Sequence, residues 1–75
     1  MQNRNFSETL KILRKERAIT QTKLAVVLKV SQKTIAHLEN GYRNPGYELL
    51  ITLADYFNVS LDYLTGRTNN PEINQ

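Results

Sequence analysis

Two short runs of polar and basic side chains have the residue types best suited to binding an anion. They follow the helix-capping residues Thr20 and Ser31, and they read Gln21-Thr22-Lys23 and Gln32-Lys33-Thr34. A helix N-terminus is partly positive and favours acids by about 0.3–1 kcal/mol. Lysine there opposes the helix dipole and costs stability. The arrangement makes sense if the free N–H groups, hydroxyls and lysines bind a phosphate together. Ordinary solvated lysines would give the same pattern, so this alternative stays open.

The second run continues into a helix whose polar face is suited to reading base edges. Ile35 and Leu38 mark its buried side. Glutamine can bridge adenine N6 and N7, lysine can reach guanine O6 and N7, and alanine can touch a thymine methyl. A histidine in this position could donate to a base or a phosphate, although a lone histidine is more often an ordinary surface residue. The candidate base readers are Gln32, Lys33, Ala36 and His37.

A further set of polar side chains is expected to hold the phosphate backbone. Such contacts fix the register of a protein on a duplex without reading its sequence. These residues flank the base-reading face, at both helix starts and beyond the second helix. They are Gln21, Thr22, Lys23, Ser31, Thr34, Asn40, Tyr42 and Arg43.

Five helices are predicted to position these residues, and no strand pattern competes with them. They cover residues 6–17, 21–28, 32–40 and 47–57, with a short fifth helix between Ser60 and Gly66. Asn5 and Glu8 form a candidate capping box, and Gly41 supplies a left-handed residue that ends the third helix. The predicted fold class is therefore all-α, with residues 1–66 as one compact domain. Residues 67–75 are polar and are expected to form a flexible C-terminal tail.

Only residues 29–31 join the second and third helices, which forces a steep, helix-turn-helix crossing. A small residue is needed where these helices touch, and Ala25 lies there. Spacing of the apolar residues predicts which side chains of the domain face inward. They are Phe6, Leu10, Leu13, Ala25, Val30, Ile35, Leu38, Leu50, Leu53, Ala54, Phe57, Leu61 and Leu64.

Charge is distributed unevenly along the 75 residues. Residues 11–43 contain eight bases and two acids, a net charge of +6, whereas residues 44–75 contain one base and four acids, a net charge of −3. This asymmetry suggests one face for a polyanion and another for something else, although a solvated charged helix would look similar. On the outer side of the first helix we expect Lys11, Arg14 and Lys15.

The composition argues against several other classes of protein. There is no cysteine, and no apolar run approaches the ~18 residues of a membrane span, so a cytoplasmic domain is expected. One histidine, no metal-ligand spacing, no glycine-rich phosphate loop and no carboxylate pair in an apolar setting leave nothing for catalysis. We therefore expect no enzyme, no catalytic residue, no metal site and no cofactor.

The chain resembles the lambda-repressor/Cro-type helix-turn-helix regulators of bacteria and phages, the Xre family. The matching residues are Thr20-Gln21-x-x-Leu24-Ala25, Val30-Ser31-x-x-Thr34-Ile35, Leu38-Glu39-Asn40-Gly41-x-Arg43-x-Pro45, Leu50, Leu53-Ala54, Val59-Ser60-Leu61-Asp62-Tyr63-Leu64 and Gly66. The resemblance implies a compact five-helix domain whose third helix lies in the major groove of double-stranded DNA. It also implies a repressor that binds a palindromic operator as a homodimer.

The acidic second half is a candidate surface for protein contacts. Exposed tyrosines among Tyr47, Tyr56 and Tyr63 could join two copies, although Tyr56 and Tyr63 are more simply explained as covers of a small core. The alternative function is an antitoxin or interaction module that binds a partner through helices 4 and 5 and also represses its own promoter.

Three positions depart from the family pattern. Lys29 occupies a turn where the family usually has glycine, and a left-handed lysine would cost about 1–2 kcal/mol. Lys23 replaces a common acid, which favours phosphate. Gly46 replaces the usual serine cap of the fourth helix, which lowers the stability of that helix by only about 0.3 kcal/mol.

Overall fold

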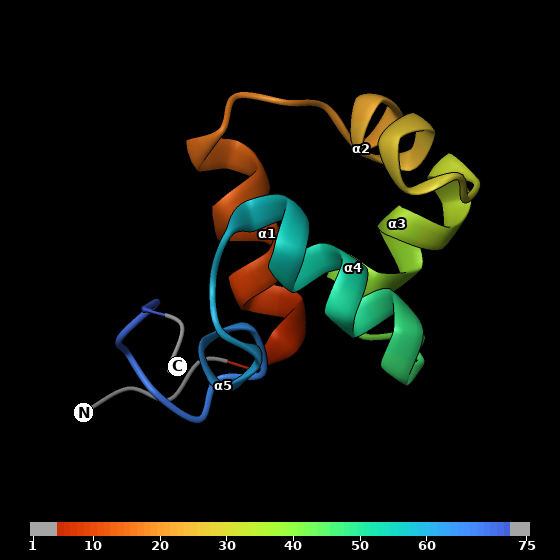
Figure 1. Cartoon of the computed structure of the whole chain (residues 1–75). Coiled ribbons are helices and arrows are strands. Elements are labelled where there is room, and N and C mark those ends of the chain that lie inside the picture. Colours follow the sequence, from red (N-terminus) through yellow and green to blue (C-terminus); the bar gives the residue numbers. More distant parts are fainter. Residues whose placement is uncertain (1–4, 73–75) are drawn as a thin grey trace.

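The computed structural model describes residues 5–72, which form five helices and no strand (Figure 1). The helices are α1 (Phe6–Glu16), α2 (Gln21–Leu28), α3 (Gln32–Glu39), α4 (Tyr47–Phe57) and α5 (Leu61–Leu64). The predicted all-α class is confirmed, and α1 and α3 each end one residue earlier than predicted. Within residues 5–72, no helix is long and apolar enough to cross a bilayer.

The helices begin where the sequence provides side chains that satisfy their free N–H groups. Asn5 and Glu8 form the predicted capping box at α1, with each side chain accepting a hydrogen bond from the other residue's N–H. Hydroxyl groups cap α2, α3 and α5, and they belong to Thr20, Ser31 and Ser60. Gly46 precedes α4 and makes no side-chain cap.

All five helices end in the same backbone motif. A left-handed residue follows each helix or its last turn, and these residues are Ala18, Lys29, Gly41, Asn58 and Gly66. The next residue then donates its N–H to the carbonyl five positions back, at 2.7–3.2 Å. This is the Schellman motif, which brings those two residues into contact. The resulting pairs are Arg14–Ile19, Ala25–Val30, His37–Tyr42, Ala54–Val59 and Asp62–Arg67.

Apolar side chains from all five helices meet in one core. Its fully buried members include Leu10, Leu24, Ile35, Phe57 and Leu64, and half-buried side chains such as Phe6, Leu50, Tyr56 and Tyr63 pack around it. The prediction that Leu61 faces inward was wrong, because this residue is 39% exposed. The helix α5 is a single turn, so its first residue lies at the edge of the packed surface.

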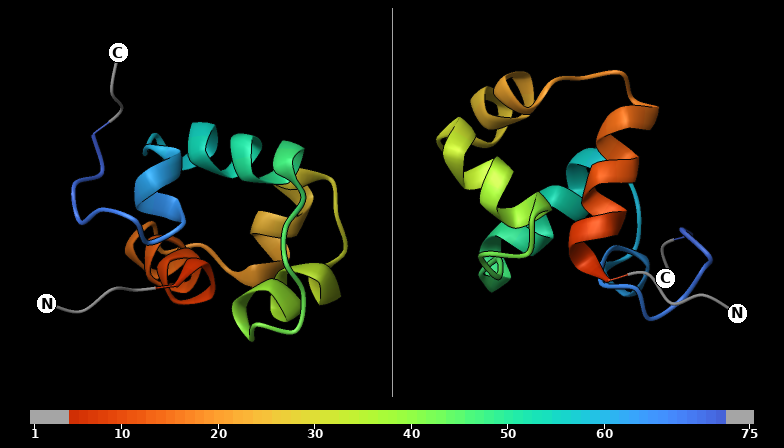
Figure 2. Two further views of the ribbon diagram at one scale, coloured as in Figure 1. Left: turned by 90° about the horizontal axis from the view of Figure 1, so that it is seen from below. Right: turned by 180° about the vertical axis from the view of Figure 1, so that it is seen from behind.

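The arrangement separates α2 and α3 from α5. Both views in Figure 2 place α2 and α3 together on one side, with α5 and the segment after it on the other. The helix α1 packs against both α3 and α5 and so connects the two sides. Of the predicted tail, residues 73–75 lie outside the described residues, and the carbonyl of Pro71 accepts a hydrogen bond from the Ser60 N–H at 3.0 Å. The flexibility of the tail stays a prediction.

Candidate nucleic-acid interface

The predicted helix-turn-helix is present in α2 and α3. Ala25, Ile35 and Leu38 are buried between the two helices and the core, and α2 packs against α3. Lys29 makes the turn in the left-handed conformation (φ 60°), the conformation for which the family usually has glycine at this position. The N–H of Val30 then reaches the carbonyl of Ala25 at 3.0 Å, which fixes the direction in which α3 begins.

A buried ion pair supports α3 from behind. The Arg14 guanidinium donates to both carboxylate oxygens of Glu39, with 3.1 Å between Nη2 and Oε1, and to the carbonyl of Ile19 at 2.9 Å. The two side chains are only 13% and 2% exposed. Arg14 was expected on the outer side of α1, and that expectation was wrong because α1 turns this side chain toward the end of α3.

The hydrogen bonds continue from Glu39 to the exposed surface. Gln21 Nε2 donates to Glu39 Oε1 at 3.0 Å, and Gln32 Nε2 donates to Gln21 Oε1 at 2.7 Å. The first residue of α2 is thereby linked to the first residue of α3. Two side chains expected to contact DNA are thus held together by a network that begins in the protein interior.

The pKa of Glu39 results from opposing effects. Burial acts to raise the pKa, but hydrogen bonds from Arg14 and Gln21 and the positive charges of Arg14 and Lys11 outweigh it. The pKa of Glu39 therefore lies below its ordinary value. The hydrogen bond to Glu39 likewise raises the pKa of Arg14 against the opposing effect of burial. Both groups are charged at neutral pH.

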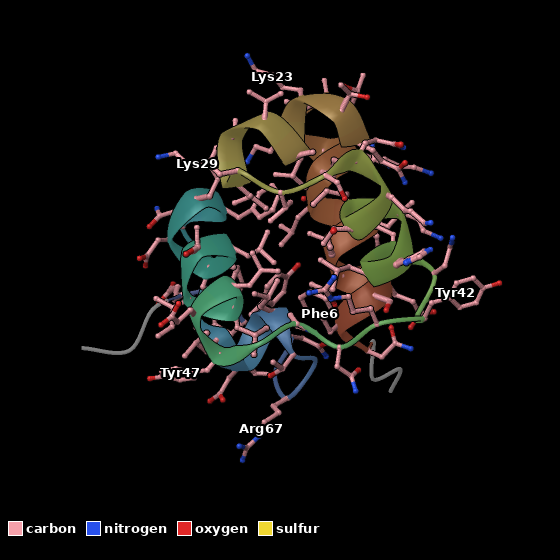
Figure 3. All side chains as sticks on the ribbon, turned by 90° about the vertical axis from the view of Figure 1, so that its right-hand side faces the viewer. Phe6, Lys23, Lys29, Tyr42, Tyr47 and Arg67 are labelled. Carbon is pink, nitrogen blue, oxygen red and sulfur yellow. The ribbon has the colours of Figure 1, made fainter. Side chains whose placement is uncertain are left out.

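The predicted contact residues lie on the solvent side of this network. Among the base-reading candidates, Gln32 and Lys33 are exposed, and Ala36 and His37 are half-buried. Of the backbone candidates, two are half-buried, Gln21 and Thr34, and the others are exposed, namely Thr22, Lys23, Ser31, Asn40, Tyr42 and Arg43. Figure 3 shows Lys23 and Tyr42 extending away from the body of the protein. Their roles in binding stay predictions.

The first turns of α2 and α3 differ from those of the other helices. They contain no acid, whereas Glu8, Glu48 and Asp62 occupy the first turns of α1, α4 and α5. Lys23 and Lys33 are exposed at these two acid-free starts. The positive ends of α2 and α3 therefore add to the charge of the lysines instead of being neutralised by the protein.

Sequence reasoning also missed a contact between two aromatic rings at the end of α3. The rings of His37 and Tyr42 lie beside each other, with centroids 5.8 Å apart and a tilt of 58°. Gly41 is the signal that could have revealed it, because a left-handed residue at a helix end brings positions 37 and 42 together.

Comparison with known proteins identifies the class to which this fold and surface belong. A helix-turn-helix family model matches residues 10–64. The chain belongs to this helix-turn-helix family, and its resemblance to lambda-repressor/Cro-type regulators is confirmed. The relatives that share this domain are named as transcriptional regulators, which agrees with the expectation that the helix-turn-helix domain is not an enzyme.

Individual relatives agree with this class. The chain is 37% identical over 70 residues to the uncharacterized HTH-type transcriptional regulator YqaE of Bacillus subtilis (strain 168), covering 93% of this chain and 60% of that protein. A transcriptional regulator from Listeria innocua superposes with a TM-score of 0.79 at 39% identity, covering 83% of this chain and 58% of that one. The P22 c2 repressor, solved in complex with a synthetic operator, gives a TM-score of 0.77 at 29% identity, covering 83% and 94%.

Proposed function

We propose that this chain is a sequence-specific repressor that binds double-stranded DNA and inserts α3 into the major groove. The observation that carries the proposal is the pair of acid-free helix starts at α2 and α3, where Lys23 and Lys33 are exposed. The likeness to the operator-bound P22 c2 repressor supports it. A DNA ligand also implies a cytoplasmic location, which we include in the proposal.

The base-reading role of α3 can be tested by selecting bound sequences from random double-stranded DNA. Gln32→Ala and Lys33→Ala should each weaken binding to the selected operator by about 1–3 kcal/mol and relax the preference at one base step. Thermal unfolding of both variants would establish that they remain folded. If both variants selected the same sequences as the parent with the same affinity, α3 would not be the reader.

The backbone contacts have a different signature. Arg43→Ala should weaken binding equally for all sequences and reduce the slope of log K against log salt by about one unit. The matched control is Arg67→Ala, because Arg67 is a similarly exposed base that lies at the opposite end of the molecule from Lys23 (Figure 3). Equal changes in the two variants would remove Arg43 from the set of phosphate contacts.

The proposal includes a homodimer on a palindromic operator. A single module binds only one half-site, whereas two copies can bind half-sites about 34 Å apart, one helical turn of DNA. Selected sequences with two-fold symmetry, together with a doubling of mass in sedimentation on that DNA, would support the dimer. An asymmetric single half-site bound by one copy would contradict it.

A second candidate function is favoured by a groove between α4 and α5. It measures about 400 Å³, and its lining includes Ile51, Val59 and Leu61 with Asp55 and Asp62. Apolar surface with acids beside it suits a protein partner, as in an antitoxin that also represses its own promoter. Leu61→Lys should abolish binding of such a partner and leave DNA binding unchanged. A protein that binds Leu61→Lys as tightly as it binds the parent would contradict a role for the groove.

A further inference from the structure

The motif that ends α3 joins two aromatic side chains, which its counterparts at the other four helix ends do not. After α2 and α4 it joins apolar pairs, Ala25–Val30 and Ala54–Val59, which help to close the core. After α3 it joins His37 to Tyr42, whose N–H reaches the His37 carbonyl at 2.9 Å. Tyr42 is 79% exposed, so burial in the core does not explain why its ring lies there.

The rings of His37 and Tyr42 are close enough to interact. Their centroid distance of 5.8 Å lies within the range of about 4.5–7 Å found for aromatic pairs, and their tilt of 58° lies between a stacked and an edge-to-face arrangement. Gly41 (φ 78°) fixes the backbone between them, and its own N–H reaches the Leu38 carbonyl at 3.4 Å. The tyrosine ring therefore lies beside the imidazole of His37 at the end of α3.

We propose that Tyr42 is a positioning residue for His37, and that its ring holds the imidazole ready to read a base edge. The inference rests on the proposed function, because it assigns a device for specificity to the same face of α3. A side chain that is already held loses less freedom on binding, and a fixed direction favours one base edge over others. The exposed hydroxyl of Tyr42 remains free for the backbone contact predicted for it.

The first test uses the free protein and needs no DNA. Replacing Tyr42 with alanine should shift the ring-proton NMR resonances of His37, because a neighbouring aromatic ring is removed. Tyr42→Phe should keep those resonances near their parental positions. Tyr47→Ala is the matched control, since Tyr47 is similarly exposed but lies on the other side of the molecule (Figure 3). Unshifted His37 resonances in Tyr42→Ala would overturn the inference.

The second test measures base preference. Sequence selection should show that Tyr42→Ala discriminates between bases about two- to tenfold less well than the parent. The loss should fall at the same base step that His37→Ala affects. The double variant should lose no more than His37→Ala alone, because Tyr42 acts through His37. Tyr42→Phe should keep the preference, even if loss of the hydroxyl weakens binding to all sequences equally.

Other outcomes separate this inference from the function on which it rests. If Tyr42→Ala weakens all sequences equally, or if Tyr42→Phe behaves as the alanine variant does, Tyr42 is a backbone contact only and the inference fails. In either case Gln32→Ala and Lys33→Ala should still change the selected sequence. If those two variants also leave it unchanged, the proposed function of α3 fails as well.

Discussion

The first turns of α2 and α3 and those of α1, α4 and α5 use opposite charges at the same structural position. The second group follows the usual rule and places Glu8, Glu48 or Asp62 at the positive end of its helix. The first group contains no acid and exposes Lys23 and Lys33 there. Local stability explains the second group. The first group makes physical sense when a polyanion supplies the missing negative charge.

The starts of α2 and α3 also have support from the protein interior. Their caps, Thr20 and Ser31, accept N–H hydrogen bonds as the caps of α1 and α5 do, so capping does not distinguish the two groups. The buried pair of Arg14 and Glu39 then ties the end of α3 to α1 and, through Gln21, to the start of α2. A surface with an unfavourable charge is thus built on an interior scaffold, and the two can be perturbed separately.

The largest expected effect is removal of one partner of the buried pair. Arg14→Met should lower the free energy of unfolding by about 3–5 kcal/mol, because it leaves the Glu39 carboxylate buried without its counter-ion. The control is Lys15→Met, an exposed base next to it on α1, which should change stability by less than about 0.5 kcal/mol. Denaturant unfolding measures both.

The double variant Arg14→Met/Glu39→Leu should recover most of the stability lost in Arg14→Met, since no buried charge remains. A loss in Arg14→Met no larger than in Lys15→Met would contradict a supporting role for the pair.

A smaller effect is expected from acid. The folded state holds the pKa of Glu39 below its ordinary value, so the ionised Glu39 carboxylate stabilises the fold fully at pH values above its pKa in the unfolded chain. That contribution should be lost as the pH falls through the lower, folded-state value. Melting temperatures measured from neutral to acid pH should therefore fall less steeply in Arg14→Met/Glu39→Leu than in the parent. Parallel acid limbs would contradict the assignment.

A modest gain is expected at the turn between the two helices. Lys29→Gly removes a left-handed strain of about 1–2 kcal/mol but adds freedom to the unfolded chain, so a net gain below about 1 kcal/mol should raise the melting temperature by a few degrees (~3). Asn58→Gly is the control, because asparagine tolerates the same conformation and should gain less. A lower midpoint in Lys29→Gly would show that the lysine side chain stabilises the turn.

Most of the fold could be predicted because its determinants are local. Caps such as Asn5, Thr20 and Ser31 precede apolar periodicity, and Gly41 marks a helix end, so the boundaries follow within a residue. A left-handed Lys29 was suggested by the resemblance, because the family usually has glycine there, whereas Ala18 could not be predicted, because alanine gives no signal for that conformation.

The contacts that could not be predicted join residues far apart in the sequence. Arg14 and Glu39 are 25 positions apart, and their pairing depends on how α1 rotates against α3. Periodicity places Arg14 beside other bases and cannot show which of them turns inward. Leu61 fails for a related reason, because one turn of helix is too short for spacing to define a buried face.

The central claim is that the lysines at the starts of α2 and α3 favour binding of an anionic ligand and lower the stability of the free protein. Exchanging charges at helix starts tests this claim most directly. Melting temperature and affinity for the selected operator should be measured on Lys33→Glu and Glu48→Lys. Lys33→Glu should stabilise the free protein by about 0.3–1 kcal/mol while weakening DNA binding at least about tenfold. Glu48→Lys should lose similar stability without weakening binding. The claim would be contradicted if Lys33→Glu bound the operator as tightly as the parent, or if it were less stable.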